Sequence, residues 1–173
     1  MGRRIIIATG IVALLGAGAC NTSGCLDNQS SLPLAEFRSS STGKQISVDS
    51  LEVVGVDAPD GDVLSPARPA KSQLYLPMRS TRSSTSWQFI YRQKALDYPE
   101  FIDIVTFDYE SIPYFASEEC GASYRYRVTR VDHTTHLIDS VRMVDSLITN
   151  VDQVSILIYF RTGEAPDEEA GSR

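Results

Sequence analysis

Hydrophobic and polar residues alternate with a period of two along much of this chain. The clearest example is the run in which Trp87, Phe89 and Tyr91 alternate with Gln88, Ile90 and Arg92. The same pattern, in stronger or weaker form, recurs in residues 34–38, 44–56, 72–76, 101–109, 124–129 and 154–160. Such alternation is typical of strands with one buried face, so it predicts a chain of short β-strands.

Polar segments rich in Gly, Pro, Ser and Asp separate these runs and predict turns. They are residues 39–43, 58–62, 80–86 and 96–99, and we expect residues 80–86 to form a polar hairpin loop. Short strands joined by turns at this spacing predict an all-β fold, an antiparallel β-sandwich of about seven to nine strands.

Residues 137–149 are ambiguous, because their apolar side chains fit two periods. Leu137, Val141, Val144 and Ile148 fall at helical spacing, whereas Val141, Met143 and Leu147 alternate. The segment contains few strong helix formers and lies among strand-like segments, so we predict a strand there.

The N-terminus has the order of a signal segment. Arg3 and Arg4 precede an apolar run over residues 5–19, which is too short to cross a bilayer, and Cys20 follows it directly. This order predicts a lipoprotein in which residues 1–19 are removed and Cys20 is fatty-acylated. Residues 17–19, Ala-Gly-Ala, also fit ordinary secretory cleavage, so a soluble secreted protein is the alternative.

The chain has three cysteines, Cys20, Cys25 and Cys120. Export would place them in an oxidising compartment, where an odd thiol needs an explanation. If Cys20 carries lipid, Cys25 and Cys120 can pair; otherwise a Cys20–Cys25 bridge would leave Cys120 free. The first arrangement leaves no thiol over, and it predicts a Cys25–Cys120 disulfide.

The remaining chain is long enough for one domain with a real core. We expect a polar tether over residues 20–31, the sandwich over 32–162 and a disordered acidic tail over 163–173. The net charge is −6, and loss of Arg3 and Arg4 would make the chain more acidic. Nucleic acid is therefore excluded as a partner, because phosphate contacts need clustered Lys and Arg.

The sequence contains two groups of possible metal ligands, and neither has the pattern of a known site. They are Asp132, His133 and His136, and Asp57, Asp60 and Asp62. The first group supplies too few ligands at no fixed geometry, and the second lacks the spacing of a calcium loop. Motifs for a nucleophile elbow, a phosphate loop or a zinc protease are missing from the sequence. We expect no metal, no cofactor and no catalytic residues.

The aromatic residues of the strand-like runs have two interpretations. They could form a surface that binds sugars or peptides, because a tyrosine or tryptophan combines an apolar ring with a polar tip. The same residues are ordinary strand formers, and a sandwich needs large side chains in its core. We predict core positions for most of Trp87, Tyr91, Tyr109, Tyr114, Tyr124 and Tyr126.

Several short pieces of the chain together resemble a known family. They are Cys20 with Cys25, residues 32–34 (Leu-Pro-Leu), Glu119-Cys120-Gly121, and residues 135–141 with Ile138-Asp139-Ser140-Val141. In these pieces the chain resembles the small lipoproteins of Bacteroidota grouped as domain of unknown function 6452. The resemblance implies an envelope lipoprotein of β-rich fold with no assigned activity, and it carries over no catalytic residues.

These observations predict a non-enzymatic binding or interaction module, attached to the membrane by the lipid on Cys20. We expect its partner to be an envelope protein or a glycan. No acidic run follows Cys20, which favours the outer membrane with the protein facing the periplasm. The alternatives are a structural accessory of outer-membrane assembly and a metal-assisted hydrolase that uses Asp132, His133 and His136.

Lipidation can be tested with Cys20→Ser. We expect this variant to leave the membrane fraction, because it lacks the acylated side chain, and cell fractionation followed by immunoblotting measures the change. Cys120→Ser is the matched control and should stay with the membrane. Pelleting of Cys20→Ser equal to that of the wild type would contradict lipidation.

Overall fold

The computed structural model describes residues 31–58, 63–93, 102–117 and 121–162. The regular structure in these ranges is β-strand, which confirms the predicted fold class. The strands are β1 (Leu34–Ser39), β2 (Leu51–Gly55), β3 (Val63–Ser65), β4 (Gln73–Tyr75), β5 (Ser84–Tyr91), β6 (Ile102–Ser117), β7 (Gly121–His133), β8 (Ile138–Met143), β9 (Leu147–Ile148) and β10 (Val154–Phe160). The described residues include no helix long and apolar enough to span a membrane.

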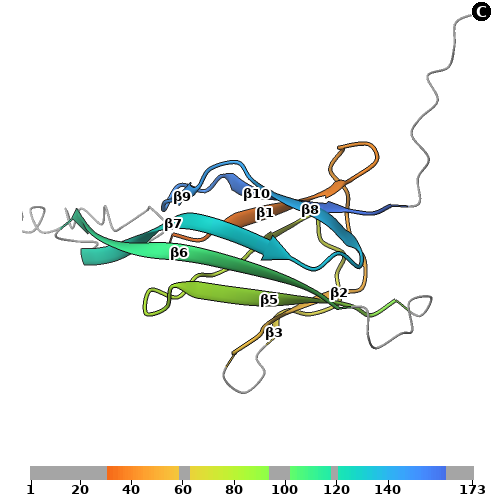
Figure 1. Ribbon diagram of the computed structural model, residues 1–173, viewed down its shortest axis with the longest axis horizontal. Helices are drawn as coiled ribbons and strands as arrows, with labels where there is room; N and C mark the ends of the chain where they lie inside the picture. The colour runs from red at the N-terminus through yellow and green to blue at the C-terminus, as the bar shows by residue number, and fades with distance from the viewer. Residues whose placement is uncertain (1–30, 59–62, 94–101, 118–120, 163–173) are drawn as a thin grey trace, which may run out of the picture.

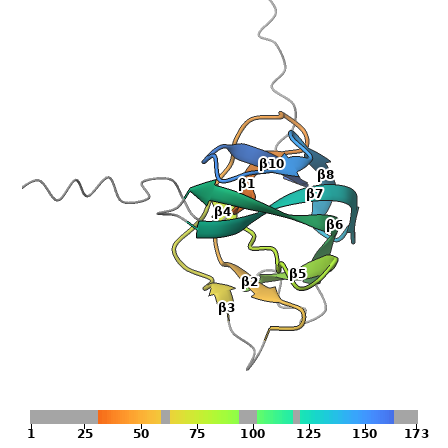
Figure 2. The same ribbon diagram turned by 90° about the vertical axis from the view of Figure 1, so that its left-hand side faces the viewer.

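The strands form two sheets that pack face to face (Figures 1 and 2). One sheet has the order β4-β1-β10-β8, and the other has the order β3-β2-β5-β6-β7-β9. Strands β1 and β10 pair in parallel, and the other pairs are antiparallel. The structure is therefore a sandwich, as predicted. The described residues form ten strands, more than the seven to nine expected, and three of these are very short: β3 and β4 have three residues each and β9 has two.

The core lies between the sheets and is filled by the alternating residues of the predicted strands. Phe37 of β1 contacts Phe160 of β10 edge to face, with ring centroids 5.2 Å apart, and Phe89 of β5 at 6.5 Å. Phe37 and Phe89 are fully buried. The Phe37–Phe160 contact lies within the four-stranded sheet, whereas the Phe37–Phe89 contact joins the two sheets. Burying a side chain of this size contributes about 1.5–3 kcal/mol, so the second contact helps to hold the layers together.

Two segments differ from the sequence-based expectation, and both are places where the chain changes sheet. In residues 44–56 only β2 is a strand, and Gln45 and Val48 form isolated bridges with Arg38 and Lys71. Residues 80–86 are not a hairpin loop. Strand β5 begins at Ser84, and the loop joins β4 of one sheet to β5 of the other. A crossing between layers cannot continue the ladder of either sheet.

The ambiguous segment 137–149 is strand, as predicted, but it divides between the two sheets. Strand β8 pairs with β10, and β9 pairs with β7. Ile138 and Ile148 are both buried, and each adds to the core from its own sheet. Because the chain leaves one sheet and enters the other within a few residues, no single period describes its apolar positions.

A buried carboxylate ties the two sheets together where the chain passes from β7 to β8. Asp103 of β6 is fully buried and accepts hydrogen bonds from the hydroxyls of Tyr91 and Thr134, each at 2.8 Å. It also accepts from the backbone N–H groups of residues 136–138, at 2.8–2.9 Å. We call these groups the Asp103 cage. They attach the start of β8 in one sheet to β5 and β6 in the other.

The cage keeps Asp103 ionised. Burial alone would raise the pKa of this carboxyl, but the backbone N–H groups of Ile138, His136 and Leu137 and the Thr134 hydroxyl hold it below its usual value. Burial, together with the charge and hydrogen bond of Asp103, raises the pKa of Tyr91. Tyr91 therefore remains protonated, and its hydroxyl donates a hydrogen bond to the carboxylate.

Asp103→Asn tests this role. We expect the free energy of unfolding at pH 7 to fall by about 3 kcal/mol or more, because an amide cannot accept from all the donors of the cage. Because folding lowers the pKa of Asp103, its ionised carboxylate stabilises the folded protein fully above the unfolded pKa of about 3.9. This stabilisation is lost as the pH falls through the lower pKa of the folded protein. The difference between wild type and variant should therefore shrink on acidification, as urea unfolding at several pH values would measure.

The matched control for this prediction is Asp108→Asn on the same strand, whose carboxyl lies outside the cage. It should change the unfolding free energy by about 0.5 kcal/mol or less. A loss in Asp103→Asn that stays constant down to pH 3 would contradict the assigned electrostatic role.

Candidate functional site

The residues singled out from the sequence do not assemble into a metal site in the described part of the chain. Asp132 forms an ion pair with Arg130, at 2.8 Å. The ring of His133 lies 3.4 Å from the carbonyl oxygen of Asp139, and the backbone of His136 belongs to the Asp103 cage. The residues Cys20, Cys25, Asp60, Asp62 and Cys120 lie outside the described residues.

The aromatic residues lie mainly in the core, as predicted. Trp87, Tyr91, Tyr109 and Tyr126 are buried, and Tyr124 is 41% exposed. The sequence therefore separated core from surface well for these side chains. It gave no indication of which polar tips lack a partner inside the protein, and that distinction locates the candidate site.

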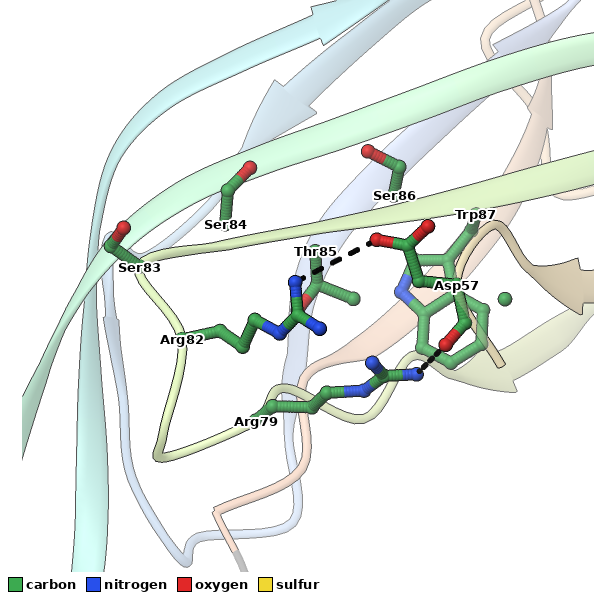
Figure 3. A pocket seen from close by; sticks show the side chains of 9 residues that line it. Asp57, Arg79, Arg82, Ser83, Ser84, Thr85, Ser86 and Trp87 are labelled. Carbon is green, nitrogen blue, oxygen red and sulfur yellow. Dashed lines mark hydrogen bonds and ion pairs between the residues drawn. The ribbon is translucent and has the colours of Figure 1, made fainter. Parts of the chain in front are cut away.

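A cavity of about 240 Å³ lies where β5 extends beyond its neighbour β2. Strand β2 ends at Gly55, which pairs with Trp87, whereas β5 begins at Ser84. The edge of β5 over residues 84–86 is thus bordered by the turn after β2, whose Val56 N–H donates to the Ser86 carbonyl oxygen at 3.0 Å. The lining residues are Gly55, Asp57, Arg79, Arg82, Ser83, Ser84, Thr85, Ser86 and Trp87 (Figure 3). We call this cavity the Trp87 pocket.

Trp87 is the only tryptophan of the chain, and its indole is the unusual group of the pocket. The side chain is 7% exposed, and its Nε1 is buried with no hydrogen-bond partner. A Cβ at Gly55 would lie 3.4 Å from the ring, so glycine at that position gives the indole room. In Figure 3 the indole nitrogen lies on the side of the ring that faces Arg79 and Arg82. A buried indole N–H normally has an acceptor, so this nitrogen is an unused donor beside the pocket in the part of the chain that the structure describes.

Two arginines and one aspartate give the described lining residues a surplus of positive charge. Arg82 lies 3.8 Å from the Asp57 carboxylate, at the long limit of an ion pair, and both side chains are largely exposed. Arg79 donates to the backbone carbonyl oxygen of Asp57 at 3.0 Å, a contact that neutralises no charge. The two guanidinium groups and one carboxylate leave the lining residues with one excess positive charge.

Hydrogen bonds from the core position the backbone of residues 76–83, which join β4 to β5 and which we call the arginine loop. The Tyr109 hydroxyl bonds to the N–H and the carbonyl oxygen of Arg79, each at 3.0 Å, and to the Thr85 hydroxyl at 2.7 Å. The Tyr126 hydroxyl donates to the carbonyl oxygen of Met78 at 3.3 Å, and the two tyrosine rings meet edge to face at 5.3 Å. Burial raises the pKa of Tyr126, so its hydroxyl stays protonated. The start of the arginine loop is thus held before any ligand arrives.

The lining of the Trp87 pocket is rich in hydrogen-bonding side chains. The described lining residues include serine and threonine hydroxyls and the carboxylate of Asp57, and no histidine or lysine. What the pocket offers is a group of hydrogen-bond donors around a small space. A ligand rich in acceptor atoms would satisfy them.

A second cavity, of about 340 Å³, opens between the sheets beside Tyr91 and Phe160. Its main polar groups already have partners. Tyr91 donates to Asp103, and Arg161 donates to the carbonyl oxygen of Thr135 at 2.6 Å and pairs with Asp139 at 3.4 Å. No unpartnered polar atom marks this space in the described residues that line it, so the Trp87 pocket is the better candidate.

The fold and the pocket define an all-β sandwich with a small, donor-rich pocket beside a buried indole. The model of a family of unknown function, DUF6452, matches residues 50–160, well over half of the chain. The chain therefore belongs to this family. The matched range includes the Trp87 pocket, the Asp103 cage and residues 119–121 and 138–141, but not Cys20, Cys25 or residues 32–34. No curated protein and no solved structure matches the chain.

The tyrosine contacts to the arginine loop can be tested with Tyr109→Phe. Loss of the hydroxyl removes the hydrogen bonds to the Thr85 hydroxyl and the Arg79 N–H, whereas the Arg79 carbonyl oxygen keeps the N–H of Arg82. We therefore expect the unfolding free energy to fall by about 1–3 kcal/mol. Tyr126→Phe is the matched control. It removes one longer hydrogen bond and should cost about 1 kcal/mol or less. Equal losses in the two variants, measured by urea unfolding, would contradict the special role of Tyr109.

Proposed function

We propose that this protein is a non-enzymatic binding module of the cell envelope that holds its ligand in the Trp87 pocket. The observation that supports this function is the buried Nε1 of Trp87, which has no partner and faces two arginine side chains. Leaving a buried donor unsatisfied costs about 1–3 kcal/mol, and a bound acceptor recovers that free energy. A purely structural role would give no reason for this donor to face a cavity.

The proposed location rests on the sequence. A basic start, an apolar run and Cys20 in succession favour an acylated protein on the outer membrane, facing the periplasm. A Cys25–Cys120 bridge would join the anchored segment to the chain next to β7, because Cys120 directly precedes Gly121, the first residue of β7. The anchor would then hold the sandwich at one defined point, and the partner would be another envelope protein or a glycan.

The single tryptophan gives a direct test of binding. Its side-chain N–H gives one signal of its own in a ¹H–¹⁵N spectrum, and a ligand that accepts from Nε1 should move that signal. We expect a screen of sugars, sugar acids, amino acids and short peptides to yield such a compound. Trp87→Phe, which lacks the indole signal and is therefore titrated by calorimetry, should bind that compound about 5–30-fold more weakly, in line with one hydrogen bond from a buried donor.

The control for this screen is Tyr124→Phe, which changes an exposed aromatic residue outside the pocket. It should leave binding unchanged. If no compound moves the indole signal of the folded protein, the Trp87 pocket is not its binding site.

A further inference from the structure

The charges of the Trp87 pocket specify more about its ligand than the cavity alone does. Arg82 and Asp57 lie 3.8 Å apart, whereas Arg92 and Glu52 elsewhere on the same sheet meet at 2.7 Å. The Arg82 guanidinium is therefore only loosely paired, and Arg79 contacts a carbonyl oxygen rather than a carboxylate. The pocket therefore combines two guanidinium groups with one buried neutral donor, the indole N–H of Trp87.

We propose that the Trp87 pocket recognises a hydroxylated monocarboxylate, the chemistry of a sugar acid. This inference rests on the proposed binding function and names its ligand class. A carboxylate suits the guanidinium groups because both are planar and can form paired hydrogen bonds. One negative charge balances the surplus of the lining residues, and a second would meet the Asp57 carboxylate.

The hydroxyl groups of the ligand follow from the acceptors in the same space. An ionised Asp57 can only accept hydrogen bonds, and its side chain is 70% exposed, so it can receive O–H donors from a ligand. The serine hydroxyls at positions 83, 84 and 86 can donate or accept. A carboxylate without hydroxyls, or an anion that only accepts, would leave Asp57 without a donor from the ligand.

The size of the pocket and the burial of the indole further restrict which ligands can bind. A cavity of about 240 Å³ is smaller than the usual range of about 300–1,000 Å³ for drug-sized ligands, so it fits one ring unit. Because Trp87 is 7% exposed, its ring face is not a platform on which a neutral sugar could stack. Recognition therefore depends on charge and on hydrogen bonds to the edge of the indole.

The test is a titration of the folded protein with four probes, followed by the Trp87 indole signal. The probes are glucuronate, glucose, acetate and inorganic phosphate, which separate charge from hydroxyl groups. We expect glucuronate to bind at least tenfold more tightly than each of the others, and its affinity should fall as salt is added. Arg79→Gln and Arg82→Gln should each weaken glucuronate binding tenfold or more.

Arg92→Gln is the matched control, because it removes the same charge from an exposed arginine outside the pocket. It should leave glucuronate binding unchanged, and the dispersion of the remaining signals shows whether each variant is folded. If phosphate binds as tightly as glucuronate, the pocket does not select a monocarboxylate. If glucose binds as tightly as glucuronate, the negative charge of the ligand does not contribute to recognition. If another compound moves the indole signal and glucuronate does not, this inference falls and the binding function stands. If no compound moves it, both fall.

Discussion

The Asp103 cage is the interaction on which the arrangement of the two sheets depends. A carboxylate taken out of water costs several kcal/mol unless its oxygens are well hydrogen-bonded. Asp103 meets this condition only because the chain folds around it between β7 and β8, with three successive N–H groups directed at its oxygens. The start of β8 is therefore set from the opposite sheet. Since β8 pairs with β10, and β10 with β1, the carboxylate also determines how the four-stranded sheet is placed.

Hydrogen bonds from buried side chains to loop segments also link the core to the Trp87 pocket. Side chains on the inner face of the six-stranded sheet carry polar tips that hold segments outside the ladders. Tyr91 completes the Asp103 cage, and Tyr109 and Tyr126 hold the backbone at residues 78–79. A loop held from a rigid sheet keeps its side chains near the geometry that a ligand needs. The arginine loop is thus held by the scaffold at its base, whereas residues 81–83 are exposed.

Particular elements show how far sequence reasoning reached in this chain. The alternation at residues 87–91 identified β5 and its inward residues correctly, because side-chain direction in a strand depends only on the parity of the position. The same reasoning extended residues 44–56 into one strand and took residues 80–86 for a hairpin loop, because local patterns do not show where a chain changes sheet. Trp87 lies in the core, as predicted, but the pocket beside it is lined by Asp57 and Arg79, which are distant in the sequence.

The sequence by itself determined the fold class, most strand positions and the aromatic character of the core. These properties follow from short-range periodicity and from the need to bury apolar side chains. Only the tertiary structure decided which polar groups are satisfied. Asp103 is one acidic residue among 22 in the sequence and became the central hydrogen-bond acceptor of the fold. Trp87 is one aromatic residue among several, and its Nε1 is among the few buried polar atoms of the described residues that have no partner. Hydrogen bonds are directional and short in range, so these donors and acceptors come within bonding distance only after the two sheets have packed together.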